Sequence, residues 1–373
     1  MALFGSKASR LIGLDIGSSS VKVVALQQSR GGYQVEAAGV GVLPAGTIVE
    51  GVIAKPEGVV SLINRIFESE NIKENQVAGS VSGHAVIVKK IALPVSNPEE
   101  VAESIQWEAE QYIPFDIADV YLDYHLLGPT EDGTGTNVIL VAAKRETVDS
   151  QSDVISISGR QPMVMDIDAF ALHNAYEVNY APDPDSVVAL LNIGASIMNV
   201  NIAAGDKFIF TRDIGMGGNY YTEYVQRDLG ISYEEAEQYK KGESPDELKL
   251  TVSSVLQSVS EILALEVQKT FDYFRTTSEF EEMQSIYICG GASRTEGLRE
   301  YLQETFQVPV EYLSPFQAIQ GSGSNVPDAV ISNGSEFAVA VGLALRQVGD
   351  KPSAASSGAT SGWKGFLNKL TKR

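Results

Sequence analysis

The sequence LIGLDIGSSSVKVVAL, residues 11–26, places a short polar stretch between two apolar runs. Both runs are rich in Leu, Ile and Val and are typical of β-strands. The stretch between them holds one glycine and three serines, which is more than a two-residue hairpin turn requires. A hairpin tip without bulky side chains exposes several backbone N–H groups in one concavity, which suits anionic oxygens, and serine hydroxyls add donors. Taken alone, the pattern also fits a solvated hairpin in which Asp15 caps the turn.

A second segment with the same plan favours the anion site. Residues 187–202, VVALLNIGASIMNVNI, repeat the order of strand, Ile-Gly, two small residues and strand. Such a repeat predicts two lobes of one plan that face each other. Two facing tips would clamp a polyphosphate between the lobes. Lys22 is close enough in sequence to reach the outer phosphates, and Asp15 is placed to hold a magnesium ion through its waters.

A third glycine-containing segment follows the repeats. Residues 285–302, SIYICGGASRTEGLREYL, predict a strand, the pair Gly290-Gly291 and then a helix. Glycines there permit close backbone approach by a flat group such as a base or ribose. Most junctions of this kind are only tight turns, so the segment gains weight from its place after the two repeats. Neither a G-x-x-x-x-G-K-[ST] loop nor a dinucleotide G-x-G-x-x-G in a strand-to-helix setting occurs.

Composition limits the classes of partner and the location. With 373 residues, two lobes or domains are expected. A net charge of −20 argues against broad nucleic-acid binding, which needs a basic face. The single cysteine, Cys289, allows no intrachain disulfide and fits a reducing compartment. The start lacks a secretory signal, and no run of eighteen apolar residues predicts a membrane span, so we expect a cytoplasmic chain.

The segment between the repeats predicts a compact module of its own. A strand over residues 84–95 precedes a helix that begins after Asn97 and ends before Pro114, and strands follow at residues 120–127 and 137–143. Within this module we expect three aromatic side chains in the core: Trp107, Tyr112 and Phe115.

The chain ends differently from everything before it. Residues 350–362 are rich in Ser, Ala and Gly and predict a flexible linker. Residues 363–373 read WKGFLNKLTKR. Four bulky apolar residues recur there at helical spacing, and four basic residues lie between and after them. This pattern predicts a short basic amphipathic helix suited to an anionic membrane surface. A helix that folds back on the body or binds another protein remains the alternative.

Three motifs in this order resemble those of the actin-like ATPase superfamily. They are Asp15-Ile-Gly-Ser-Ser, Asn192-Ile-Gly-Ala-Ser and Gly290-Gly291-Ala-Ser, and the similarity spans about residues 11–346. GGNYYTEYVQRDLGISYEEAEQYK, residues 217–240, is similar to the FtsA and PilM branch. WEAEQYIPFDIADVYLDYHLL, residues 107–127, and the N-terminal motif resemble more closely the PilM family of type IV pilus assembly proteins.

The resemblance implies an α/β, actin-like two-lobed fold of duplicated ribonuclease H-like domains, with a small inserted α+β module. It implies binding of ATP and Mg²⁺ by residues on three loops and one helix. Those assigned to the nucleotide are Asp15, Gly17, Ser18, Ser19, Ser20, Lys22, Gly194, Ala195, Ser196, Glu237, Lys240, Gly290 and Gly291. Asp15 is also assigned to Mg²⁺ through water, and Asp168 falls where relatives keep a water-positioning Gln or Glu. A helix cap is the alternative role for Asp168, and a solvated surface charge is the alternative for Glu237.

The resemblance also implies a place and partners. It implies a scaffold on the cytoplasmic face of the inner membrane, in the machinery of twitching motility. The partner would be the cytoplasmic N-terminal peptide of PilN, docked between the first lobe and the inserted module. PilO and PilP would be reached through PilN, with PilC and PilB nearby. The tail resembles the membrane-targeting end of FtsA in pattern only.

One departure and two rival functions complete the sequence-based picture. The second phosphate loop of relatives usually carries an acid where this chain has Asn192, so we expect slow or negligible hydrolysis, because an amide supplies no negative charge. The rivals are an FtsA-like membrane-associated cytoskeletal filament and a small-molecule kinase, for which no substrate motif is present. The expected domains are a first lobe (1–84 and 156–185), the inserted module (85–155), a second lobe (186–216 and 285–349) with a helical subdomain (217–284), the linker (350–362) and the tail (363–373).

Overall fold

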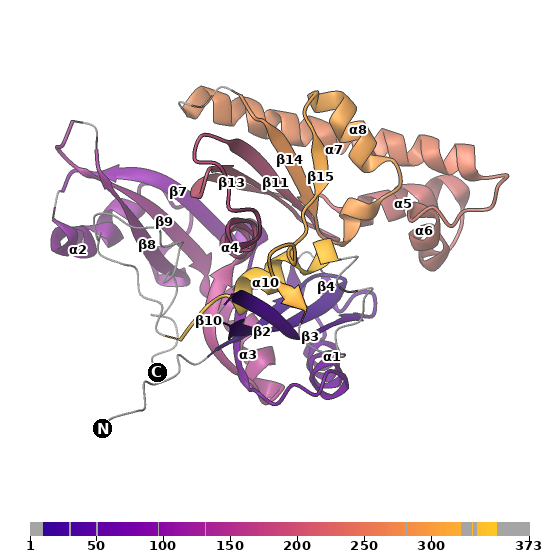
Figure 1. Ribbon diagram of the computed structural model, residues 1–373, viewed down its shortest axis with the longest axis horizontal. Helices are drawn as coiled ribbons and strands as arrows, with labels where there is room; N and C mark the ends of the chain where they lie inside the picture. The colour runs from indigo at the N-terminus through magenta and orange to yellow at the C-terminus, as the bar shows by residue number, and fades with distance from the viewer. Residues whose placement is uncertain are drawn as a thin grey trace.

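The computed structural model describes residues 10–348 apart from 30, 50, 96, 131, 279, 281, 322–329 and 331–333. Two large sheets form the two halves of the molecule (Figure 1). The first sheet has the order β10-β6-β1-β2-β3-β16, with bounds Gln161–Ile167, Gln76–Val81, Ile12–Ile16, Ser20–Ser29, Gly32–Val42 and Gln320–Gly321. The second has the order β13-β12-β11-β14-β15, with bounds Lys207–Ile214, Met198–Ala204, Val187–Ile193, Ser285–Cys289 and Val310–Tyr312.

The two sheets share one topology, as the internal repeat predicts. In each half two antiparallel hairpins run through three neighbouring strands, β1-β2-β3 and β11-β12-β13, and the first of these strands pairs in parallel with the next one, β6 or β14. The registers also correspond, because Asp15 pairs with Lys22 across the first hairpin and Asn192 with Asn199 across the second.

Helices bury their apolar stripes against these sheets. α1 (Pro56–Ser69) has Pro56 in its first turn and buries five apolar side chains in the first core. α7 (Lys249–Thr277) lies along the second sheet with α5 (Gly218–Leu229), α6 (Tyr233–Lys240) and α8 (Leu298–Phe306). Among the described residues, α7 alone is long and apolar enough to cross a membrane by length and composition. Ten of its side chains are buried, most of them in the core that it shares with the second sheet.

Two helices pack where the halves meet. α4 (Asp168–Tyr180) joins β10 to β11 and is buried almost all round. α10 (Ala338–Ala344) contacts α4 and β1 so closely that a Cβ on Gly342 would lie 1.7 Å from the Ala171 carbonyl oxygen. The sequence-based division places residues 285–349 in the second lobe. β16 instead pairs with β3 in the first sheet. The apolar side chains of α10 pack with those of β2, β3 and α4 in a core beside that sheet.

The inserted module is a three-stranded sheet with a helix on one face. Its strands, in the order β7-β9-β8, are Val86–Leu93, Thr136–Lys144 and Val120–Pro129, and its helix α2 is Pro98–Ala109. Alternate residues of β9 face the module's own core and the core of the first sheet, so the module is joined firmly to the first half.

Two details of the module differ from the sequence-based picture. α3 (Arg145–Ile157), expected within the module, packs against β6 and β10, because Val148, Val154 and Ile155 fill the first core. Trp107 is 75% exposed on α2, although we expected it in the core, while Tyr112 and Phe115 pack against the module's core as partly buried residues. Position 107 falls on the outer face of α2, which no other element of the described residues covers.

Short elements complete the chain: β4 (Ile48–Val49) and β5 (Val52–Ile53) form a small hairpin, and single turns of 3₁₀-helix include η1 (Gly83–Ala85) and η3 (Gly291–Arg294). Arg10 forms an antiparallel bridge with Gln347, so the two ends of the described chain lie together beside the first sheet (Figure 1). The predicted linker and tail lie outside the described residues.

Candidate functional site

A cleft of about 620 Å³ lies between the two halves. Both hairpin turns, the loop after β14 and helix α6 line it. Every residue that the sequence assigns to the nucleotide or to catalysis lines this one cleft, including Asp168. The structure therefore brings together residues that lie up to 276 positions apart, from Asp15 to Gly291; their roles as ligands stay a prediction.

The first turn combines a hydrogen-bonded backbone loop with a buried ion pair. The Gly17 N–H donates to the Ser20 carbonyl oxygen (3.0 Å), and the Leu43 N–H donates to the Ser19 carbonyl (2.9 Å). Lys22 Nζ lies 3.3 Å from Asp15 Oδ2, and each side chain is only about a tenth exposed, at 11% and 12%. The positively charged Lys22 ammonium group therefore lines the cleft together with the serines of the turn.

The second turn has the same backbone bond and a different support. The Gly194 N–H donates to the Ile197 carbonyl (2.9 Å). The first N–H groups of α5 then hold the turn, because Gly218 N donates to the Gly194 carbonyl (2.9 Å) and Asn219 N to the Ala195 carbonyl (2.8 Å). With their carbonyls tied to α5, these residues present less negative charge to an anion in the cleft.

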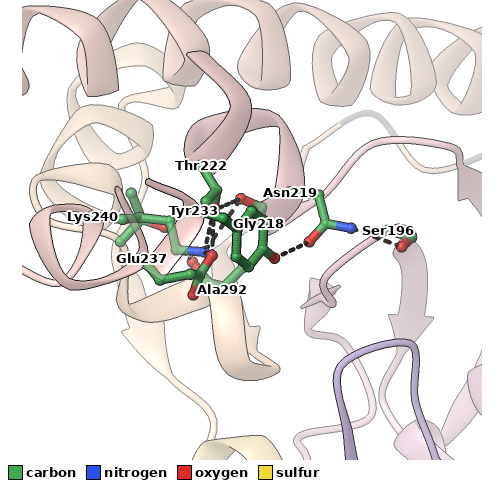
Figure 2. A network of polar contacts seen from close by, with 9 residues as sticks. Ser196, Gly218, Asn219, Thr222, Tyr233, Glu237, Lys240 and Ala292 are labelled. Atoms are coloured by element: carbon green, nitrogen blue, oxygen red, sulfur yellow. Dashed lines mark hydrogen bonds and ion pairs between the residues drawn. The ribbon is translucent and has the colours of Figure 1, made fainter. Parts of the chain in front are cut away.

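Asn219 also joins the second turn to the start of α6. Its amide Nδ2 donates to Ser196 Oγ (3.2 Å), and Tyr233 donates its hydroxyl to Asn219 Oδ1 (3.4 Å) (Figure 2). In Figure 2 the same view shows Thr222, Glu237 and Lys240 converging on one point beside Gly218.

A buried lysine orients the carboxylate on the predicted nucleoside side. Lys240 Nζ donates to Thr222 Oγ1 (3.0 Å) and to the Gly218 carbonyl (3.3 Å), and it pairs with Glu237. Burial lowers the pKa of Lys240, and the Glu237 carboxylate opposes that change. Glu237 is therefore fixed within a network, which is more than the solvated surface charge that the sequence left open.

Gly290 permits the close approach expected of the third loop. Its φ is +83°, and a Cβ there would lie 2.5 Å from the Ile193 carbonyl oxygen. A Cβ on the neighbouring Gly291 would meet no heavy atom of the described residues within 4 Å. Glycine is thus required at 290 by its neighbours, whereas at 291 it leaves open space on the cleft wall.

Asp168 begins α4 and faces the cleft with the first turn. The Ser80 hydroxyl donates to its Oδ1 (2.6 Å). Burial and the nearby Asp15 carboxylate raise the pKa of Asp168 to about 7, while hydrogen bonds from Ser80 and Ser82 oppose the increase. Two carboxylates in one desolvated cleft supply oxygen donors of the kind that Mg²⁺ prefers. The carboxylates of Asp15 and Asp168 therefore fit a magnesium site whose remaining ligands would include phosphate oxygens.

Asn192 occupies the position of the absent acid and lies in an amide chain. Its Nδ2 donates to Asn199 Oδ1 (2.9 Å), and Asn199 Nδ2 donates to Asp213 Oδ1 (2.5 Å). Burial raises the pKa of Asp213, while the Asn199 amide and the Gly83 N–H lower it.

Sequence reasoning missed several side chains of the cleft. They are Ser80, Ser82, Asn199, Asn219, Tyr233, Arg294 and Thr295. One local signal was available: Ser232 and Glu235 form a capping box that starts α6 and so sets Tyr233 at the cleft. Ser80 and Asn199 lie near strand ends, Ser82 precedes η1, Asn219 is in the first turn of α5, and Arg294 and Thr295 lie at the end of η3.

Two copies of one sheet topology around a cleft lined by matching turns define an actin-like protein. The fold is also that of ethanolamine utilization protein EutJ from Carboxydothermus hydrogenoformans, with a TM-score of 0.56, 16% identity and coverage of 91% of this chain and 90% of that one. The chain belongs to the family described as type IV pilus assembly protein PilM, which matches residues 13–348. The resemblance seen in the sequence is thereby confirmed.

Further comparisons agree. A structure titled PilM-PilN type IV pilus biogenesis complex is similar with a TM-score of 0.81 and 28% identity, covering 91% of this chain and 98% of that one. The cell division protein FtsA of Pseudomonas aeruginosa is 23% identical over 372 residues, which cover 87% of each chain.

Proposed function

We propose that this protein is an ATP-binding, actin-like cytoplasmic scaffold of type IV pilus assembly that binds the cytoplasmic N-terminal segment of a PilN-type membrane partner. The observation that carries the nucleotide part is the pair of matching turns on opposite walls of one cleft. Membership of the PilM family and the similarity to the PilM-PilN complex support the partner. PilO and PilP would be reached only through PilN, with PilC and PilB close by.

The residues of this chain divide the work of binding. Backbone N–H groups and hydroxyls of Ser18 and Ser196 donate to phosphate oxygens, and Lys22 adds a positive charge. Asp15 would hold Mg²⁺ through water, and the ion would supply positive charge that neutralises the phosphates. Glu237 offers a fixed acceptor on the nucleoside side.

We expect ATP to close the two halves, with slow hydrolysis. Asn192 directs its amide into the chain toward Asp213 and supplies no carboxylate at the second turn. Asp168 is the remaining acid placed to orient a water, and its raised pKa leaves it partly protonated near neutral pH. Rapid steady-state phosphate release that Asp168→Ala abolishes would contradict slow hydrolysis.

Trp107 provides the direct test of the partner. The chain has two tryptophans, and the second is Trp363 in the tail, so protein truncated after Val348 has one reporter on the inserted module. Titration with a synthetic PilN N-terminal peptide, with and without ATP and Mg²⁺, should change its fluorescence saturably, and a scrambled peptide should not. Trp107→Phe controls for the reporter, with calorimetry as the second readout. Absence of binding in every condition would exclude the partner.

The tail is proposed to add contact with the membrane surface. It carries four basic residues, each contributing about 1 kcal/mol near an anionic leaflet. Full-length protein should sediment with anionic liposomes more than protein lacking residues 363–373. Equal sedimentation would end this part of the proposal, and nucleotide-dependent sedimentation without liposomes would favour the FtsA-like filament.

A further inference from the structure

A carboxylate of the second half grips a loop of the first half. Asp213, at the end of β13, accepts a hydrogen bond from the backbone N–H of Gly83, the first residue of η1. Its other oxygen accepts from Asn199. The two contacting residues are 130 positions apart, and Asp213 is half-buried.

Apolar and backbone contacts hold the same loop. Gly83 has φ +81°, and a Cβ on it would lie 2.6 Å from Ile197 Cδ1 at the second turn. Close by, a Cβ on Gly215 would lie 3.0 Å from His84 Nε2. The second half thus encloses the loop from the turn and from the end of β13.

The carboxylate also fixes the direction of the amide chain. Because an ionised Asp213 can only accept, Asn199 must point its Nδ2 toward it and its Oδ1 toward Asn192. Asn192 then points its own oxygen to the side of Gly290, where a Cβ would lie 2.6 Å from that atom. One chain of hydrogen bonds therefore runs from Asn192, whose side-chain oxygen lies beside Gly290, through Asn199 and Asp213 to the loop of the first half.

The gripped loop leads directly into the inserted module. On its N-terminal side Ser80 bonds to Asp168 in the cleft, and on its C-terminal side β7 begins at Val86. A shift of Gly83 relative to the second half would therefore move Ser80, which bonds to Asp168 in the cleft, and also β7, the first strand of the module.

We propose that Asp213 is a positioning residue that clasps residues 82–85 to the second half and couples the nucleotide cleft to the inserted module. The coupling rests on the proposed function, which supplies the two ligands; the clasp itself does not. Since coupling is reciprocal, nucleotide should change peptide affinity by the factor by which peptide changes nucleotide affinity.

The first measurement needs no ligand. Hydrogen exchange of the Gly83 amide in the full chain should be at least about tenfold faster in Asp213→Ala than in the wild type, because the acceptor is gone. Asp213→Asn, which keeps one acceptor oxygen, should lie between them. Asp206→Ala, an exposed acid in the turn between β12 and β13, is the matched control and should leave the exchange unchanged. Equal exchange in Asp213→Ala and wild type would overturn the clasp.

The second measurement tests the coupling. The Kd of the PilN peptide should differ by about fivefold or more with and without ATP and Mg²⁺ in the wild type. In Asp213→Ala the ratio should fall to within about twofold of one while both ligands still bind. Two bound ligands without any such difference in the wild type, or an unchanged ratio in Asp213→Ala, would overturn the coupling and leave the proposed function standing. Failure of the wild type to bind either ligand would overturn the proposed function and with it the coupling, while the exchange result still judges the clasp.

Discussion

The two hairpin turns share one backbone design and differ in charge. Each glycine N–H bonds to the carbonyl three residues later, at 3.0 Å for Gly17 and 2.9 Å for Gly194. The cross-strand pair that flanks the turn is Asp15–Lys22 in the first half and Asn192–Asn199 in the second. The first pair is ionic, with 3.3 Å between Nζ and Oδ2, and the second is a neutral amide contact of 2.9 Å.

This difference shows how a duplicated hairpin takes two tasks. A buried ion pair is costly unless further groups use its charge, so we expect Asp15 and Lys22 to contact a charged ligand in the cleft. The amide pair needs no counter-charge and can extend as a chain to Asp213. The first half thus keeps its charge at the cleft, and the second places its acid where the halves touch.

The largest expected effect tests how tightly the second turn is enclosed. Gly290→Ala should lower the free energy of unfolding by about 3 kcal/mol, because it forces a Cβ against the Ile193 carbonyl at a positive φ. Gly291→Ala is the matched control and should change it by no more than about 0.5 kcal/mol, since its Cβ meets open space. Urea denaturation measures both, and equal losses would show that the neighbours of Gly290 give way.

A pH dependence of stability tests the contact between α4 and the turn that joins β12 and β13 in the second sheet. His173 Nε2 lies 3.0 Å from the Asp206 carbonyl, and burial lowers the pKa of His173 to about 4. The unfolded state, with its pKa near 6.5, binds more protons below that pH, so stability falls as the pH drops from about 6.5 toward 4. Between pH 7 and 5 this group alone should remove about 2 kcal/mol. His173→Gln should flatten that part of the profile; an unchanged profile would assign the loss to other groups.

The charged first turn predicts a ligand effect without a counterpart in the second. Lys22→Met should weaken ATP binding about tenfold, because a charge-assisted contact to phosphate contributes on the order of 1.5 kcal/mol. Lys207→Met, an exposed lysine at the start of β13, should change affinity by less than about twofold. Calorimetric titration at low and moderate salt measures this. An equal loss in the two variants would mean that general charge, and no specific contact, attracts the nucleotide.

What the sequence could predict depended on how local the signal was. The strands around Gly17 and Gly194 and the Gly290 loop are specified by neighbouring residues, and their positions agree with the structure. The returns of β16 and α10 to the first sheet depend on packing between distant segments, such as Gly342 against Ala171, which no local pattern reports. The role of Asp213 could not be predicted from the sequence either, because it depends on a contact with Gly83, 130 residues away.

The smallest expected effect on stability comes from Asn192→Asp, which gives the second turn an acid at the position that Asp15 occupies in the first. Asn192→Asp puts a carboxylate against Asn199 Oδ1, and that amide can point its Nδ2 to only one of the two acids beside it. One carboxylate then lacks its partner, so we expect the free energy of unfolding to fall by about 1 kcal/mol. The pKa of one of the two acids should rise as well, because each disfavours the charge of the other.

The same substitution tests why hydrolysis should be slow. If the missing acid limits turnover, Asn192→Asp should raise phosphate release from ATP and Mg²⁺ about tenfold, which is less than the roughly 100- to 10,000-fold that a fully positioned acid–base group contributes. Asn192→Ala is the control at the same position, since it removes the amide contact without adding charge and should gain no rate. A loss of stability without a gain in rate in Asn192→Asp would show that the neutral pair serves the contact between the halves, and that slow turnover has its origin elsewhere in the cleft.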